Sequence, residues 1–231
     1  MDKVCVPPSL KRLTIIIDNE VGAYLEMKAP DLEYLYINGI TSGEVFSMYN
    51  LHNVVEAHLN VFLQPFSSVI PLNNLLGNLS GTKHLVLGRS TTKWLLGEPH
   101  DLNFQELCYL FRLELTLCRC NINSVLNLLQ KCPMLQVLII HNDKEQSSFL
   151  RWTSTPCVPN CLVSHLTFIQ FKGFRGFSDE VSFAEYVLQK GLVLKTLIIA
   201  DISVDLKEKY DILKTISDVP RASGMCQLKF D

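Results

Sequence analysis

The sequence lacks every short motif that marks a common class of catalytic site. It has no G-x-S-x-G nucleophile turn, no phosphate-binding G-x-x-x-x-G-K-[ST], no H-E-x-x-H and no G-x-G-x-x-G. Serine, histidine and acidic residues are present, but a catalytic nucleophile needs a base and an orienting group in contact with it. The sequence therefore predicts a protein that is not an enzyme and uses no cofactor.

Long apolar runs and clusters of like charge are also missing. No run approaches the roughly 18 apolar residues of a membrane span, and the first residues show no apolar stretch of the signal-peptide type. Charged residues make up 19% of the 231 residues, and the net charge is −2 with both signs dispersed. This pattern argues against nucleic-acid and membrane partners. We expect a cytoplasmic or nuclear location, or both.

The eight cysteines do not form the paired spacings of a structural zinc site. Cys118 and Cys120 form one close pair, and Cys157 and Cys161 form another, but no C-x-x-C or H-x-x-x-H pair completes either set of four ligands. Disulfides are not expected without a secretory signal. We predict that the cysteines are small apolar fillers and that no metal is bound.

A short apolar unit recurs along the whole chain. Residues 132–142, CPMLQVLIIHN, give its clearest copy, in which Leu135, Leu138 and Ile140 follow the pattern apolar-x-x-apolar-x-apolar. We call the middle residue the anchor. The anchors are Leu13, Leu35, Ala57, Leu85, Leu113, Leu138, Ile169, Leu197 and Leu228. Their steps run from 22 residues, between Leu13 and Leu35, to 31, between Leu138 and Ile169, which is typical of leucine-rich repeats with a few insertions.

The repeats predict an α/β leucine-rich-repeat solenoid with a parallel sheet on its concave face. Helical segments are predicted between the strands at 73–79, 103–110, 122–131 and 179–190, and a last one after Asp205. Ser178 and Asp205 are the expected N-caps of the final two helices. In the last helix, the apolar stripe predicted to face the core is Leu206, Tyr210, Leu213 and Ile216.

The C-terminal third carries residues at spacings that resemble a known domain. The first group precedes and opens a predicted strand over 164–172, and it comprises Trp152, Pro156, Val158, Pro159, Cys161 and Leu162. The second group is in the tail and comprises Cys226, Leu228 and Phe230. Together with the segment between them, these residues resemble the FBD domain of plant F-box proteins with leucine-rich repeats. We expect both groups to be structural, with the first pinning a loop before the strand and the second forming the last strand.

The resemblance implies two units and a role. Residues 1–150 are expected to be irregular leucine-rich repeats, and residues 151–231 an FBD domain that continues the array. Proteins of this family look like substrate receptors of SCF-type ubiquitin ligases, in which an F-box docks on the adaptor and the repeats capture a target. No F-box lies within the 231 residues, so we expect an unknown target protein as partner, and the SCF adaptor only if an F-box is supplied upstream.

Two other hypotheses remain. The chain is alternatively a decoy without an F-box, or an inactive family fragment without a ligase role. A repeat fragment of the immune-receptor type is disfavoured by the FBD-like tail and by the absence of a nucleotide-binding region in the sequence.

Candidate binding residues follow from the alternation of side chains along a strand. The anchor and the residue two positions later point into the core, so the residues beside them point to the opposite face. Tyrosine and arginine are favoured at protein interfaces. The predicted protein-binding residues on the concave face are Tyr34, Tyr36, His58, His84, Arg112 and Glu114.

Overall fold

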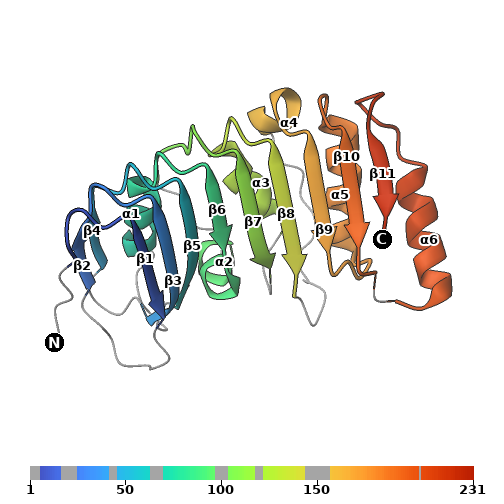
Figure 1. Ribbon diagram of the computed structural model, residues 1–231. Coiled ribbons are helices and arrows are strands. Elements are labelled where there is room, and N and C mark those ends of the chain that lie inside the picture. The colour runs from blue at the N-terminus through green and yellow to red at the C-terminus, as the bar shows by residue number, and fades with distance from the viewer. Residues whose placement is uncertain are drawn as a thin grey trace.

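A nine-stranded parallel sheet forms the framework of the protein (Figure 1). The structure is a computed structural model that describes residues 6–16, 25–41, 46–62, 70–96, 104–117, 122–143, 157–202 and 204–231. The strands, in their order across the sheet, are β1 (Arg12–Ile16), β3 (Tyr34–Thr41), β5 (Glu56–Phe62), β6 (His84–Leu87), β7 (Arg112–Leu117), β8 (Val137–Asn142), β9 (Phe168–Lys172), β10 (Thr196–Ala200) and β11 (Gln227–Phe230). Two further strands, β2 (Leu25–Lys28) and β4 (Phe46–Tyr49), pair with each other in a small parallel sheet.

Helices connect the strands and cover one face of the sheet. They are α1 (Ile70–Asn78), α2 (Arg89–Leu96), α3 (Ile122–Gln130), α4 (Asn160–Ser164), α5 (Ser178–Lys190) and α6 (Leu206–Ser217). In Figure 1, α1, α3 and α5 lie behind the sheet, and α6 lies beyond β11 at the C-terminal end. The protein is therefore a mixed α/β structure whose other sheet face is turned toward the reader.

Every predicted anchor occupies the same level of the sheet. Leu13 pairs with Leu35, and the register continues strand by strand to Leu197 and Leu228. The residues two positions later form a second aligned row, from Ile15 to Phe230. Most of both rows is fully buried, which confirms the parallel sheet and the inward direction of these side chains.

A repeated backbone contact holds neighbouring strands at one level. Just before the strands, two successive N–H groups donate to one carbonyl of the preceding unit: those of Glu33 and Tyr34 to Lys11 O, at 2.9 and 3.1 Å. The same pair of bonds recurs from unit to unit as far as Lys195 and Thr196, which donate to Thr167 O. The connections can therefore vary in length without shifting the strands relative to one another.

The sheet runs without a break through the predicted boundary near residue 150. Val137 of β8 pairs with Phe168 of β9, and the same register continues through the next residues to Ile140 and Phe171. The segments assigned to the repeats and to the FBD-like end thus share one sheet. The boundary itself stays a prediction.

One predicted helix is wrong and another was missed. The described part of the predicted helix over 103–110 is irregular, whereas Arg89–Leu96 form α2. The missed helix contains Thr91 and Thr92, which are poor helix formers. Both are fully buried, and Thr91 Oγ1 donates to Leu59 O at 3.0 Å while it accepts from Val61 N–H at 2.8 Å. Tertiary hydrogen bonds to β5 therefore stabilise a helix that local propensity does not predict.

The segment before β9 also differs from the expectation. A loop was predicted there, with the strand beginning at residue 164, but α4 occupies Asn160–Ser164 and β9 begins at Phe168. Pro159 directly precedes α4, a position where a missing backbone N–H costs nothing because the first helical N–H groups have no partner within the helix. Cys161 and Leu162 of this short helix are fully buried.

Two apolar assignments near the C-terminus need correction. The predicted stripe of α6 fails at its start, because Leu206 and Tyr210 are 87% and 64% exposed, while Ile216 is buried and Ile212 packs on the core. In the last unit, the apolar position before the anchor is filled by buried Cys226, whose N–H donates to Ser223 O at 3.1 Å; Met225 is exposed. The buried position therefore lies two residues before the anchor Leu228, instead of three as in the other units.

Of the two predicted N-caps, one is confirmed. Asp205 caps α6, with its Oδ1 accepting from the N–H groups of Lys207 and Glu208, both at 2.9 Å. At the start of α5, Ser178 is the first helical residue, and the N–H of Phe177 donates to Glu180 Oε2 at 3.2 Å. The predicted N-cap at Ser178 is therefore wrong, and Glu180 instead accepts a hydrogen bond from the residue that precedes the helix.

Replacing an anchor should destabilise the protein far more than replacing its neighbour. Leu138 is fully buried and Val137 is only half-buried on the other face. We expect Leu138→Ala to lower the free energy of unfolding by about 2–5 kcal/mol, since it removes buried methyl groups and leaves a cavity. Val137→Ala is the matched control and should cost less than about 1 kcal/mol. Urea unfolding followed by circular dichroism measures both; equal losses would contradict the assignment of faces.

Candidate functional site

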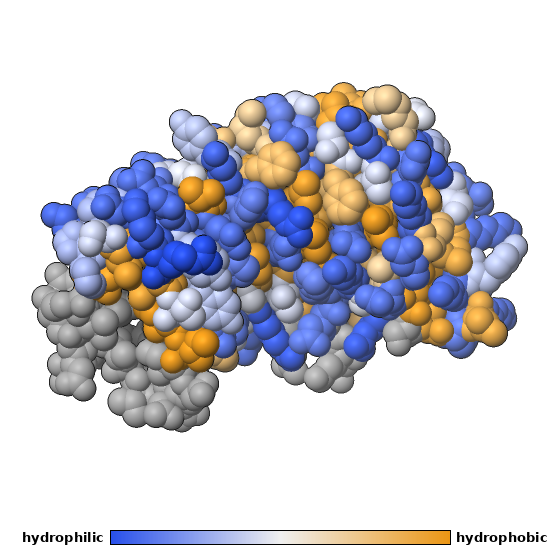
Figure 2. All heavy atoms as spheres, viewed as in Figure 1, coloured by the Kyte–Doolittle hydropathy of each residue, from blue (hydrophilic) through white to orange (hydrophobic). Residues whose placement is uncertain are grey.

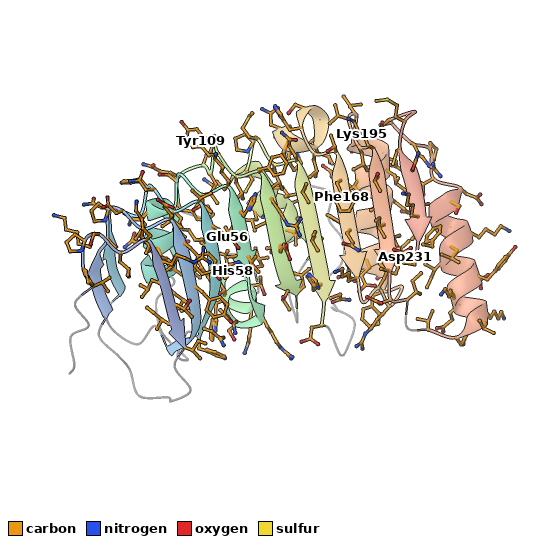
Figure 3. The ribbon with its side chains drawn as sticks, in the orientation of Figure 1. Glu56, His58, Tyr109, Phe168, Lys195 and Asp231 are labelled. Carbon is orange, nitrogen blue, oxygen red and sulfur yellow. The ribbon has the colours of Figure 1, made fainter. Side chains whose placement is uncertain are left out.

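The sheet face opposite the helices displays a continuous field of side chains across all nine strands. We call it the open face and define it by the residues one position before, one after and three after each anchor. The sequence-predicted residues all lie on it: Tyr34 and Tyr36 on β3, His58 on β5, His84 on β6, and Arg112 and Glu114 on β7. His84 is exposed and the other five are half-buried. Figure 3 labels His58 and Glu56 on this face.

Four of the open-face residues form a cluster around His58. The rings of Tyr34 and Tyr36 each lie with their centroids 5.8 Å from that of His58. The Arg12 guanidinium carbon is 4.1 Å from the centroid of the Tyr34 ring, a cation–π distance. Glu56 Oε1 lies 2.7 Å from His58 Nε2 and fixes the imidazole. The structure therefore brings together Tyr34, Tyr36 and His58 as one preorganised aromatic surface, which we call the tyrosine cluster.

The remaining three predicted residues lie beside this cluster. Arg112 donates from Nε and Nη2 to Glu114 Oε1, at 2.8 and 2.6 Å. His141 Nε2 is 3.7 Å from Glu114 Oε2, so the carboxylate bridges β7 and β8. His84 instead stacks obliquely on Phe111, with ring centroids 6.3 Å apart. The charged side chains of β5 and β7 thus pair along their own strands, Glu56 with His58 and Arg112 with Glu114.

Two asparagine amides at the carboxyl ends of β3 and β5 also lie on this face. Their hydrogen bonds to each other and to the next connection were not predicted from the sequence. Asn60 donates from Nδ2 to Asn38 Oδ1 at 2.8 Å, and its Oδ1 accepts from Ser90 N–H at 3.0 Å. A Cβ at Gly88 would lie 2.6 Å from Asn60 Oδ1, so only glycine leaves room for this arrangement. The repeated Asn at the third position after the anchors Leu35 and Ala57 was the available signal.

The family-motif residues lie mainly on the core side. Trp152 and Pro156 fall outside the residues that the structure describes. Val158 is 38% exposed, whereas Pro159, Cys161, Leu162 and Cys226 are buried. Leu228 and Phe230 of β11 are half-buried and pack against the core. None of these described residues points into the open face.

One buried carboxylate near this motif was not singled out from the sequence. Glu180 of α5 is fully buried, and its carboxylate accepts from the side-chain amide of Asn142 on β8 and from the N–H of Arg175 at 3.0 Å. It therefore ties the helix to the strand and to the turn after β9. A Glu in the first turn of a helix commonly accepts from the N–H that precedes the helix, so this contact could have been predicted from the sequence, but the contact with Asn142 could not.

Three of the described cysteines, Cys132, Cys161 and Cys226, are buried as small apolar residues. Cys132 and Cys161 are buried, and their Sγ atoms lie 3.4 Å from Leu128 O and 3.6 Å from Leu129 O. Burial raises the pKa of the Cys161 thiol to about 12 and also raises the pKa of Cys132. Within the described ranges, no three His, Cys, Asp or Glu side chains gather as they would around a metal ion. A search of the same residues finds no helix of the length and hydropathy that crossing a membrane requires.

Comparison with protein families finds one matching segment, which includes β9 and α5. Residues 155–199 match the FBD family model. This segment is therefore similar to an FBD domain. Its matched residues run from just before α4, through β9 and α5, to β10, and fall inside the predicted unit 151–231.

Relatives in Arabidopsis thaliana extend the similarity to nearly the whole chain. An F-box/FBD/LRR-repeat protein is 28% identical and covers 100% of this chain, which spans 54% of that protein. A putative F-box/FBD/LRR-repeat protein is 32% identical over 97% of this chain and 51% of its own length. A probable FBD-associated F-box protein is 27% identical over 87% and 46%. The resemblance to this family is confirmed, and the chain spans about half the length of these curated relatives. No solved structure matches.

The raised pKa of Cys161 predicts a pH dependence of stability. The thiol holds its proton more tightly in the folded protein, with a pKa of about 12, than in the unfolded chain, where it titrates near 9.0. This contribution to stability is complete below about pH 9 and is lost as the pH rises toward 12. Between about pH 8 and pH 10, the wild type should therefore lose roughly 1 kcal/mol more unfolding free energy than Cys161→Ala.

The measurement is urea unfolding of both proteins at the two pH values, under reducing conditions. Apart from Cys132, whose pKa is raised in part by Cys161, the other groups titrate alike in the two proteins, so their contribution cancels in the difference. A difference between wild type and variant that does not change with pH would show that Cys161 is not a desolvated thiol.

Proposed function

We propose that the chain is an irregular leucine-rich-repeat array that ends in its FBD domain and recognises a target protein through the open face. The aligned anchors support the repeat assignment, because each unit buries the same positions and adds one strand to the sheet. One observation carries the functional part. The open face holds tyrosines, histidines and an arginine in fixed contacts, yet leaves them accessible to solvent.

Such a surface suits recognition better than catalysis. Its aromatic rings are large, rigid and amphipathic, which makes them effective interface anchors. The polar groups around them are mostly engaged with each other, as in Glu56 with His58 and Arg112 with Glu114. No serine, threonine or cysteine on the described open face has a base and an orienting partner assembled around it. A binding role therefore needs fewer additional assumptions than an enzymatic one.

The names of the relatives suggest the setting in which this recognition takes place. They combine an F-box, an FBD domain and leucine-rich repeats, a combination that supports a substrate-receptor role in an SCF-type ubiquitin ligase. In that role the open face holds the target, while an F-box in the longer protein holds the adaptor. The net charge of −2 and the dispersed signs agree with a cytoplasmic or nuclear setting and with protein rather than nucleic acid as partner.

Removal of the two tyrosines should weaken target capture. In Tyr34→Ala/Tyr36→Ala, the surface around His58 loses its aromatic anchors, and we expect capture of the target from plant extract to fall at least about tenfold, or about 1.4 kcal/mol. Quantitative mass spectrometry of the captured proteins is the readout. Gln189→Ala, on the exposed side of α5, is the control and should capture as the wild type does. Unchanged capture by the double variant would rule out the tyrosine cluster as a binding site.

A test of adaptor binding distinguishes the substrate-receptor role from the decoy hypothesis. The chain of 231 residues and a fusion carrying a family F-box at its N-terminus are each incubated with purified Skp-type adaptor. We expect only the fusion to bind, with the target captured equally by both. If the fusion also failed to bind the adaptor while it still captured the target, the decoy hypothesis would replace the ligase role. Adaptor binding by the chain alone would place an adaptor contact within the repeats or the FBD domain.

A further inference from the structure

The C-terminal part of the open face differs in chemistry from the tyrosine cluster. Apolar side chains of β8, β9 and β10 gather there, and we call them the β8–β10 patch. It consists of the half-buried Val137, Phe168 and Ile198 and the buried Ile139. Val137 pairs directly with Phe168, and one row further along Gln170 lies between Ile139 and Ile198. Figure 2 shows hydrophobic residues among hydrophilic ones over this part of the face, and Figure 3 labels Phe168 on β9.

Three lysines border this patch. Lys229 of β11 is the register partner of Ile198, Lys195 directly precedes Thr196 beside Phe168, and Lys172 ends β9. Lys195 and Lys229 are exposed and Lys172 is half-buried. Two acidic residues of this end, Asp201 and Asp231, lie past the ends of β10 and β11.

These lysines differ from the paired charged groups of the open face, because no acidic side chain among the described residues forms an ion pair with them. Arg112 and Glu114 pair with each other, and Glu56 pairs with His58. Among the described residues, no carboxylate lies within 4.0 Å of the amino groups of Lys172, Lys195 or Lys229. Uncompensated positive charge around accessible apolar side chains favours an occupant that supplies both apolar groups and negative charge.

We infer that the β8–β10 patch binds a segment of the target protein in which aromatic or aliphatic anchors alternate with aspartate or glutamate. The apolar side chains of that segment cover Phe168, Val137 and Ile198, and its carboxylates pair with Lys229, Lys195 and Lys172. This inference rests on the proposed recognition function and names the chemistry of its substrate. It also divides the open face into two subsites, because the tyrosine cluster lies on β3 and β5, toward the other end of the sheet.

The test starts from a displayed library of random peptides selected on the immobilised chain. Peptides that also bind Phe168→Ser/Lys229→Glu are removed by counter-selection. The surviving sequences should combine Phe, Leu or Trp with neighbouring Asp or Glu. Survivors without acidic enrichment, survivors rich in Lys or Arg, or the absence of any survivor would overturn the inference.

The most enriched peptide is then synthesised with a fluorescent label, and its dissociation constant is measured by anisotropy. We expect Lys229→Glu and Phe168→Ser each to weaken binding about tenfold, and higher salt to weaken binding to the wild type because the charges are exposed. Lys83→Glu is the matched control, since Lys83 is an exposed lysine at the start of β6, away from the patch. An equal loss in Lys83→Glu would show that net charge, not the patch, is responsible.

Two further measurements keep the outcomes distinct. Circular dichroism and the thermal midpoint establish that each variant is folded, and Lys229→Glu, at an exposed position, gives a second route to the answer if Phe168→Ser is unstable. Vesicles containing phosphatidylserine serve as a competing probe, and preference for them over the peptide would replace the peptide with an anionic membrane surface. If target capture depends on Tyr34 and Tyr36 but not on Lys229 or Phe168, the proposed function stands and this inference fails.

Discussion

The structure depends on one backbone contact that recurs at the start of the strands. Two successive N–H groups, such as those of Val55 and Glu56, donate to a single carbonyl of the preceding unit, here Glu33 O. The contact uses no side chain, so it tolerates almost any residue, and it fixes each new strand at the level of the last. Connections as different as the one through α2 and the one through α5 therefore leave the anchors aligned. Because the level is fixed, the inward rows form a continuous core and the outward rows form a continuous open face.

The two rows of each strand are under different constraints. Inward positions such as Leu138 and Ile140 are fully buried and restricted to apolar residues by the packing of the core. Outward positions have no such restriction, and their chemistry changes along the sheet from the tyrosine cluster, through the Arg112–Glu114 pair, to the β8–β10 patch. A framework of this kind allows the open face to change without affecting the core, which suits the recognition role that we propose. The FBD-like segment contributes to the same surface rather than forming a separate body, since β8 and β9 pair across the predicted boundary.

The features that could be predicted from the sequence are those that local chemistry dictates. The alternation around each anchor gives strands, and the direction of their side chains follows from the pleat; likewise, Asp205 before an apolar run predicts a capped helix. Features that depend on tertiary contacts were missed. Helix α2 is stabilised by hydroxyl bonds from Thr91 to β5, and Glu180 reaches from α5 to Asn142 on β8. On the open face, the sequence could place Arg112 and Glu114 side by side, but it could not predict that they pair along one strand instead of across strands.

We propose that the target rests on the open face of the sheet. The most direct measurement places a photoreactive amino acid at Tyr36, on the open face, and in a second protein at Gln189, on the exposed side of α5. Each protein is irradiated together with the target that the wild type captures, and the covalent adducts are identified by mass spectrometry. Our account predicts an adduct to the target from position 36 and none from position 189. Adducts of equal yield from both positions, or from position 189 alone, would contradict it.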